Sequence, residues 1–165
     1  MSAYKKKISK SYLILIFFIF LALIFYFTIN RFQKEKELAL QPISINLLTS
    51  VHPKLSWSFQ PVKPNMLIKP GEITTVEYVA ENLGSIETTG IATFAYFPKE
   101  FGSYISKINC FCYDAKTLRP NEKDRFTLVL LIDPEVTKDS KTKNVKEITI
   151  QFTFFDYKEY KKTES

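Results

Sequence analysis

The sequence predicts an all-β fold, an immunoglobulin-like β-sandwich tethered by one N-terminal transmembrane helix. One observation is a charge-free apolar run near the N-terminus that is as long as a bilayer is thick. Another is that the chain after Pro42 consists of short apolar runs separated by turn residues. The length of 165 residues, with 45% hydrophobic and 24% charged residues, is typical of one folded domain with an appendage.

The apolar run is interpreted as an uncleaved membrane anchor over residues 11–30. Its core, Tyr12 to Ile29, has 18 residues, which as a helix measure ~27 Å. Tyr12 and Tyr26 lie near the two ends, where amphipathic rings prefer the membrane interface. The run is longer than the hydrophobic part of a signal peptide and is followed by no small-residue cleavage motif.

The flanking charges indicate the orientation of this anchor. Four lysines precede the anchor, whereas three basic residues, Arg31, Lys34 and Lys36, follow it. The N-terminal flank is also short. We therefore expect residues 1–10 in the cytoplasm of a bacterium, an anchor in its inner membrane, and the rest in the periplasm. Residues 31–50 are assigned to a linker and residues 51–160 to the folded domain.

The expected elements follow in order. Arg31–Leu40 is predicted to extend the helix until Pro42 stops it. The last strand is the clearest, since Ile148, Ile150 and Phe152 alternate with polar residues. No helix is expected after Pro42, and 157–165 is expected to fray. The candidate strands are Ile43–Leu48, Leu55–Phe59, Ile73–Glu81, Ile91–Phe97, Tyr104–Tyr113, Phe126–Ile132 and Val145–Phe155.

Residues that form turns separate these strands, and they include Pro70-Gly71, Asn82-Leu83-Gly84, Arg119-Pro120-Asn121-Glu122 and Asp133-Pro134. Trp57, the single tryptophan, is expected to pack in the core. His52 beside Pro53 is interpreted as an exposed bystander and not as a metal ligand.

Composition excludes several classes of function. The net charge of +6 suggests a nucleic-acid binder, but four lysines and no acidic residue fall in residues 1–30. The remaining chain carries 19 basic and 17 acidic residues, which implies no extended basic face. Four glycines argue against a glycine-rich nucleotide loop, and one histidine with two cysteines excludes most metallohydrolases.

The two cysteines, Cys110 and Cys112, flank Phe111 at the end of a predicted strand. In an extended strand both sulfurs face the same side and Phe111 points the other way, into the core. A disulfide between them requires a sharp local distortion, because extended Cβ atoms lie ~6–7 Å apart. Two inert buried thiols are another interpretation, and a soft-metal site for Cu(I) is the third.

The segment Tyr104–Tyr113 resembles the signature of the CtaG family of copper-delivery proteins, which carries Lys-Ile-x-Cys-Phe-Cys followed by an aromatic residue. Further similarities occur in the same order along residues 55–157. They are the Trp-x-Phe-x-Pro entry strand at Trp57–Pro61, Pro70-Gly71-Glu72, Gly90-Ile91-Ala92-Thr93, Ile132-Asp133-Pro134 and Thr153-Phe154-Phe155.

This resemblance implies an immunoglobulin-like domain on the periplasmic or intermembrane-space side, with Cu(I) bound by Cys110 and Cys112. It also implies delivery of copper to the copper B centre in subunit I of cytochrome c oxidase, and no enzymatic activity. Because one chain offers only two soft ligands, we expect either a digonal site or a copper-bridged homodimer. No nucleic acid is expected as a partner.

Two departures from the family pattern stand out. Family members commonly carry a third cysteine just after the anchor, whereas Tyr26–Gln41 has none. The family's Leu-x-Pro-Gly-Glu turn has Asn121 in place of glycine, and asparagine tolerates the left-handed conformation that such a turn requires. The alternatives to a copper chaperone are a thiol–disulfide oxidoreductase and a metal-free scaffold in oxidase assembly.

Overall fold

The computed structural model describes residues 10–39 and 41–164, and the side chains of residues 11–34 and 41–162. The first element is helix α1, Lys10–Ala39, whose segment Ser11–Lys34 is long and apolar enough to cross a membrane. The helix predicted over the apolar run and its helical extension are thereby confirmed as one element, whose length and composition fit the expected anchor, and the expectation for residues 1–9 lies outside the described residues. The helix and the β-domain are separate units.

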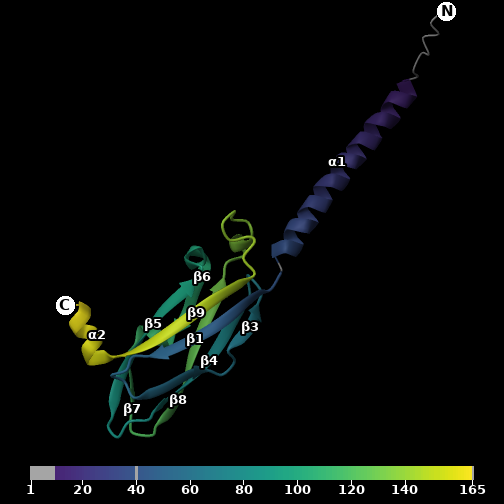
Figure 1. Cartoon of the computed structure of the whole chain (residues 1–165). Helices are drawn as coiled ribbons and strands as arrows, with labels where there is room; N and C mark the ends of the chain where they lie inside the picture. Colours follow the sequence, from purple (N-terminus) through teal and green to yellow (C-terminus); the bar gives the residue numbers. More distant parts are fainter. Residues whose placement is uncertain (1–9, 40, 165) are drawn as a thin grey trace, which may run out of the picture. The chain divides into compact units, whose positions relative to one another are not determined.

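The β-domain consists of two sheets (Figure 1). The five-stranded sheet, called sheet A, has the order β3-β1-β9-β5-β7, and the four-stranded sheet B has the order β2-β4-β8-β6. Sheet A is built from β1 (Ile43–Val51), β3 (Asn65–Ile68), β5 (Thr88–Phe97), β7 (Lys116–Leu118) and β9 (Glu147–Asp156). Sheet B is built from β2 (Trp57–Pro61), β4 (Ile73–Asn82), β6 (Ile105–Cys110) and β8 (Lys123–Ile132).

The predicted sandwich is confirmed, but its strand list was incomplete. Strands β3 and β7 were not expected, because runs of four and three residues are too short to display an alternation of apolar and polar side chains. Short 3₁₀ turns η1 (Lys99–Tyr104) and η3 (Pro134–Thr137) precede β6 and follow β8.

Strand β1 departs from the expected organisation in two ways. It pairs in parallel with β9, from Ser44 opposite Glu147 to Val51 opposite Phe154, whereas short strands separated by turns led us to expect antiparallel pairs throughout the sandwich. It also lies between β3 and β9, inside sheet A, although residues 31–50 were assigned to a linker. The β-domain therefore begins at Ile43, only a few residues after the end of α1.

The chain ends in helix α2, Tyr157–Glu164, where fraying was expected. The Asp156 carboxylate caps this helix by accepting hydrogen bonds from the backbone N–H groups of Lys158 and Glu159, at 3.0 and 3.1 Å. Glu159 pairs with Lys54 of the β1–β2 connection at 2.7 Å. Hydrogen bonds from Lys54 and Lys162 lower the pKa of Glu159 to about 2. Fraying was expected because this segment is mixed in charge and shows no hydrophobic periodicity. The capping bonds and the contact with a residue 105 positions away cannot be seen in the sequence.

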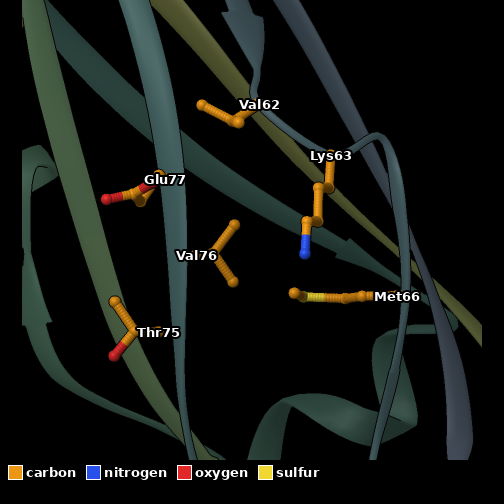
Figure 2. A pocket seen from close by; sticks show the side chains of 6 residues that line it. All are labelled: Val62, Lys63, Met66, Thr75, Val76 and Glu77. Carbon is orange, nitrogen blue, oxygen red and sulfur yellow. The ribbon is translucent and has the colours of Figure 1, made fainter.

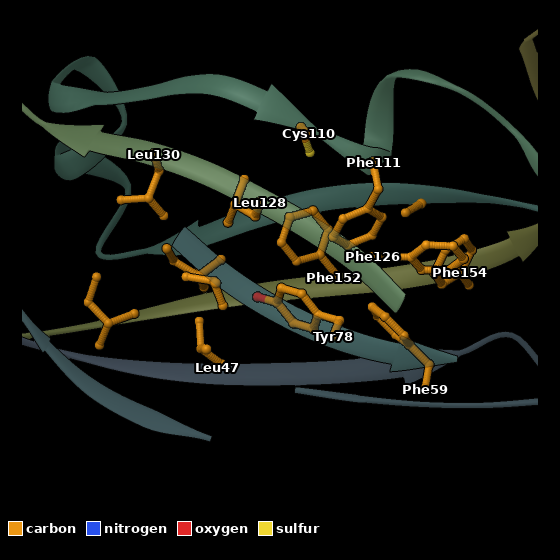
Figure 3. Close-up of a cluster of buried hydrophobic side chains, with 14 of the residues drawn as sticks. Leu47, Phe59, Tyr78, Cys110, Phe111, Phe126, Leu128, Leu130, Phe152 and Phe154 are labelled. Atoms are coloured by element: carbon orange, nitrogen blue, oxygen red, sulfur yellow. The ribbon is translucent and has the colours of Figure 1, made fainter. Parts of the chain in front are cut away.

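The core lies between the two sheets, and a cluster of aromatic rings packs there among aliphatic side chains (Figure 3). The ring of Phe152 on β9 meets Tyr78 on β4 with 5.4 Å between centroids, and Phe154 meets Phe59 on β2 at 4.8 Å. Trp57 is buried 5.1 Å from Phe154, and its indole N–H donates to the Thr88 hydroxyl at 2.8 Å. The expected packing role of Trp57 is confirmed.

The turn that departs from the family pattern is formed as expected. Asn121 has a φ of 58°, in the left-handed region, and Gly71 of the β3–β4 turn has a φ of 87°. Around Asn121, the Glu122 N–H donates to the Arg119 carbonyl at 3.0 Å, and the Glu122 carboxylate accepts from the Arg119 N–H at 2.7 Å. Asn121 therefore adopts the left-handed conformation that was expected of it.

One buried polar group in the core generates a prediction. The Tyr78 hydroxyl is buried and has no hydrogen-bond partner among the described residues, and burial raises its pKa. An unsatisfied buried hydroxyl costs about 1–3 kcal/mol, so Tyr78→Phe should raise the free energy of unfolding by about 1 kcal/mol. Denaturant unfolding of the full chain in detergent, followed by Trp57 fluorescence, measures it. A loss of stability would contradict the assignment of an unsatisfied group.

Candidate functional site

The two cysteines lie where the chain crosses from one sheet to the other. Strand β6 is an edge strand of sheet B and ends at Cys110. A 3₁₀ turn, η2, follows over Phe111–Tyr113, and the next strand, β7, belongs to sheet A. The site is thus built at an edge of the sandwich, on a turn with a strand on each side.

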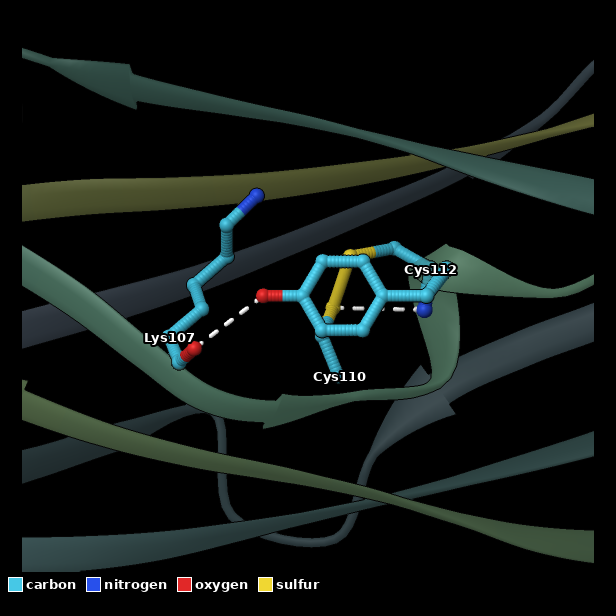
Figure 4. Close-up of a disulfide and its surroundings, with 4 residues drawn as sticks. Lys107, Cys110 and Cys112 are labelled. Carbon is cyan, nitrogen blue, oxygen red and sulfur yellow. Dashed lines mark hydrogen bonds between the residues drawn. A yellow bond between two sulfur atoms is a disulfide. The ribbon is translucent and has the colours of Figure 1, made fainter.

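The expectation that Cys110 and Cys112 continue one extended strand is wrong. The turn η2 brings their Cα atoms to 5.1 Å, and the two sulfurs are joined in a disulfide (Figure 4). The backbone N–H of Cys112 also donates to Cys110 Sγ at 3.2 Å. The sharp local distortion that a disulfide at this spacing requires is therefore present. The sequence left a disulfide open as one interpretation, but it predicted an extended strand here, because the run Tyr104–Tyr113 shows no sign of a turn.

Phe111 fixes this turn to the core, as the sequence predicted for the residue between the cysteines. Its buried ring lies 4.7 Å from Phe152 and 5.4 Å from Phe126, centroid to centroid, and also contacts Phe59, Tyr78 and Phe154. These partners come from both sheets, so the ring links the turn to the whole sandwich. The two sulfurs are positioned by the side chain between them.

The two cysteines differ in exposure. Cys110 is 3% exposed and belongs to the core cluster, whereas Cys112 is half-buried. Solvent and partners therefore reach the pair mainly through Cys112. The sequence predicted that both sulfurs face away from the core, opposite to Phe111, and this is wrong for Cys110, which ends β6 and belongs to the core cluster.

A lysine and two aromatic rings surround the approach to the pair. The Lys107 ammonium lies 4.5 Å from the centroid of the Phe94 ring and 5.6 Å from that of Tyr113. The Tyr113 hydroxyl donates to the Lys107 carbonyl at 3.0 Å, which ties together the two ends of the segment that holds the cysteines. Partial burial lowers the pKa of Lys107. Phe94 comes from β5 and carries no sequence signal that links it to this site.

The other residues considered for metal binding lie elsewhere. His52 stacks on Phe155 with 5.6 Å between ring centroids, and Met66 lies on β3, at the far edge of sheet A from β7. Within the described part of the chain, no three His, Cys, Asp or Glu side chains gather as a metal site. Among the described residues of this turn and its neighbouring strands, the soft ligands are Cys110 and Cys112.

The packing of Phe111 generates a prediction. Phe111→Ala removes a ring that touches both sheets, so the free energy of unfolding should fall by about 3–5 kcal/mol. Ile108→Ala is the matched control, because Ile108 lies two residues before the pair but is 54% exposed, and its cost should stay below about 0.5 kcal/mol. Denaturant unfolding of both variants measures the two losses in the free energy of unfolding. Equal losses would show that Phe111 does not anchor the turn.

Comparison with known proteins gives a consistent result. The family model for cytochrome c oxidase assembly protein CtaG/Cox11 matches residues 25–156. A protein named cytochrome c oxidase assembly protein CtaG from Sinorhizobium medicae is 36% identical over 129 residues, which cover 78% of this chain and 65% of that protein. The same name is borne by a relative from Ehrlichia ruminantium, 36% identical over 125 residues, covering 76% of this chain and 71% of the relative. The chain therefore spans slightly less than two thirds of the first relative.

Proposed function

The chain belongs to the family of cytochrome c oxidase assembly proteins CtaG/Cox11, and from this premise we propose that it is a membrane-anchored Cu(I) chaperone. Its role is to insert copper into subunit I of cytochrome c oxidase while the oxidase is assembled. Copper is its cargo, and no bond of an organic substrate is made or broken, so the protein is not an enzyme. The observation that carries the proposal is the close approach of Cys110 and Cys112 on one turn.

The ligand set suits Cu(I) better than other ions. Two thiolates are soft ligands, and Cu(I) accepts low coordination numbers, whereas a structural Zn²⁺ site takes four ligands. Loading begins with reduction of the disulfide. A partner dithiol gives up two electrons and becomes a disulfide, the Cys110–Cys112 bond breaks, and both cysteines become thiols. Binding of Cu(I) then releases their two protons.

Transfer proceeds by ligand exchange. Since Cys112 is the more accessible cysteine, a recipient's imidazole reaches the copper from that side while Cys110 still holds it. Soft thiolates retain Cu(I) until replacement ligands arrive, which limits loss of copper to solvent. An anchor of the length of α1 confines the chaperone and an integral membrane oxidase to one plane, and this raises their effective concentration.

A copper-bridged homodimer is the resting form that this ligand count favours. Each chain supplies two cysteine sulfurs, so two chains can pool four thiolates around copper. Pooling gives each ion more thiolate contacts and shields the sulfurs from oxidation. The alternative is a digonal copper site within each monomer.

The proposed location is a bacterial inner membrane, with the N-terminus in the cytoplasm and the β-domain in the periplasm. The four lysines that precede the anchor support this orientation. An oxidising compartment also suits a chain whose two cysteines form a disulfide.

The same disulfide favours a second candidate function, a thiol–disulfide oxidoreductase. In this role the Cys110–Cys112 bond is exchanged with a dithiol of another protein, and Cys112 is the sulfur that is open to attack. Copper binding by the reduced protein distinguishes the two functions, since only the chaperone requires it. An exchange rate no faster than that of a simple peptide disulfide would remove the second candidate.

Copper titration tests the proposed function. The full chain in detergent, reduced and kept anaerobic, should bind about one Cu(I) per chain, and the disulfide form should bind none. Cys110→Ser and Cys112→Ser should each abolish tight binding, because a single thiolate remains. Metal analysis after competition with a chelator gives the stoichiometry.

Met66→Leu is the matched control for that titration, since it removes the only other internal sulfur without touching the pair. Undiminished copper binding by the double Cys→Ser variant would sink the proposal. Binding of no copper by the reduced wild-type chain would leave a metal-free scaffold in its place. Sedimentation of the same samples should show a dimer that forms with copper and is lost in both serine variants.

Reporter fusions test the orientation. A reporter that is active only in the periplasm, fused after Ser165, should be active, and a cytoplasm-dependent reporter at the same position should be silent. The reason is the excess of lysine before the anchor. Replacing Lys5, Lys6, Lys7 and Lys10 by glutamine should reduce the periplasmic signal. The reverse pattern in the wild-type chain would place the cysteines on the wrong side for the proposed delivery.

A further inference from the structure

We infer that the open edge of strand β4 is a binding site for an extended polypeptide segment that carries an apolar side chain beside an acidic one. The site lies between the two sheets, on the side where β2 ends and the chain crosses to β3. It shares no residue with the cysteine turn, so the inference does not rest on the proposed function.

The first observation is an unused strand edge. Strand β2 pairs only with Tyr78–Asn82 of β4, and one further bond joins the Val62 N–H to the Glu77 carbonyl at 2.9 Å. Backbone groups of every second residue in a strand point to the same neighbour. The N–H and C=O of Thr75, two residues before Glu77, therefore point to the position that β2 has left. An added strand would find a donor and an acceptor there.

The second observation is a slot beside this edge (Figure 2). Its volume is about 250 Å³, and its lining includes Val62, Met66 and Val76. Met66 comes from sheet A and Val76 from sheet B, and Figure 2 shows their side chains pointing towards each other. Small-molecule sites usually measure about 300–1,000 Å³, so a slot of this size suits the side chain of a peptide better.

The third observation is a cation at the slot. The Lys63 side chain reaches towards Val76 and Met66 in Figure 2, and none of the ion pairs among the described residues includes it. Glu77 also lines the slot, and its carboxylate lies 3.6 Å from the Arg125 guanidinium on β8. Lys63 is therefore the charged group of the slot that has no ion-pair partner there, and this favours a ligand with a carboxylate next to its apolar side chain.

These observations define the occupant. The ligand lies along β4 in the position that β2 has left. One of its residues exchanges backbone hydrogen bonds with Thr75. The apolar side chains on either side of that residue enter the slot. Side chains of residues that lie opposite each other in two paired strands point to the same face of the sheet. The side chain opposite Thr75 therefore points to solvent, as the Thr75 side chain does. The recognition mode is strand addition to a sheet edge, with the slot and Lys63 adding specificity.

The test uses the full chain in lipid nanodiscs and a dye-labelled, C-amidated heptapeptide, Ser-Thr-Leu-Thr-Leu-Thr-Asp. Fluorescence polarisation should show saturable binding. N-methylation of the central threonine should weaken binding at least about tenfold, because it removes a bond to the β4 edge. N-methylation of either leucine should change it by less than about twofold, because that N–H points away from β4. This comparison leaves the protein unaltered.

Two charge variants complete the test. Lys63→Glu should weaken binding about fivefold, whereas Lys143→Glu, on the exposed loop before β9, should leave it unchanged. The Cys110→Ser, Cys112→Ser double variant should bind the peptide normally, which separates this site from copper binding. Absence of saturation, equal effects of both N-methylations, or equal effects of both lysine variants would each overturn the inference. Self-association that the peptide disrupts would assign the edge to a second copy instead of another polypeptide.

Discussion

The contact on which the site depends is the packing of the Phe111 ring between the two sheets. The ring lies within 5.4 Å of Phe126 on β8 and 4.7 Å of Phe152 on β9, so it is part of the core that holds the sandwich together. Its neighbours in sequence are the two cysteines. Because a buried aromatic ring has one well-packed position, the backbone on both sides of it is fixed as well. The rigidity of the core is thereby passed directly to the two sulfurs, without a separate scaffold for the site.

The position of this ring also explains why the two cysteines are unequal. The chain must leave sheet B at the end of β6 and enter sheet A at β7, and the turn over Phe111–Tyr113 makes that crossing. Cys110 is still at the end of the strand and is buried, while Cys112 has passed the ring and is half-buried. A metal held by such a pair has one sheltered and one accessible ligand. This asymmetry suits a carrier, since it offers a direction of release that two equally exposed thiolates would lack.

The sequence was sufficient where periodicity or residue type determines structure. The anchor, the two-layer β architecture, the inward direction of Phe111 and the left-handed Asn121 could all be predicted in this way. Features that depend on contacts between distant residues could not. The parallel pairing of β1 with β9 joins segments about 100 residues apart, and the cation–π contact of Lys107 with Phe94 joins two sheets. The turn at Cys110 was missed for a local reason, because a 3₁₀ turn directly after a strand interrupts no visible pattern.

Sheet B separates the two proposed sites by a distance that would let them operate together. The cysteine turn follows β6 at one edge, and the slot lies beside β4 where β2 at the other edge has ended. Since neighbouring strands lie about 4.8 Å apart, β4 and β6 are roughly 10 Å apart across the sheet. A polypeptide added to β4 therefore leaves Cys112 uncovered. A partner held at the slot would remain near the sulfurs through successive collisions, and tethering of this kind raises the effective concentration of a ligand without tightening the bond to copper. Under the two proposals made above, copper would be held firmly in the absence of a partner and passed on when one is bound.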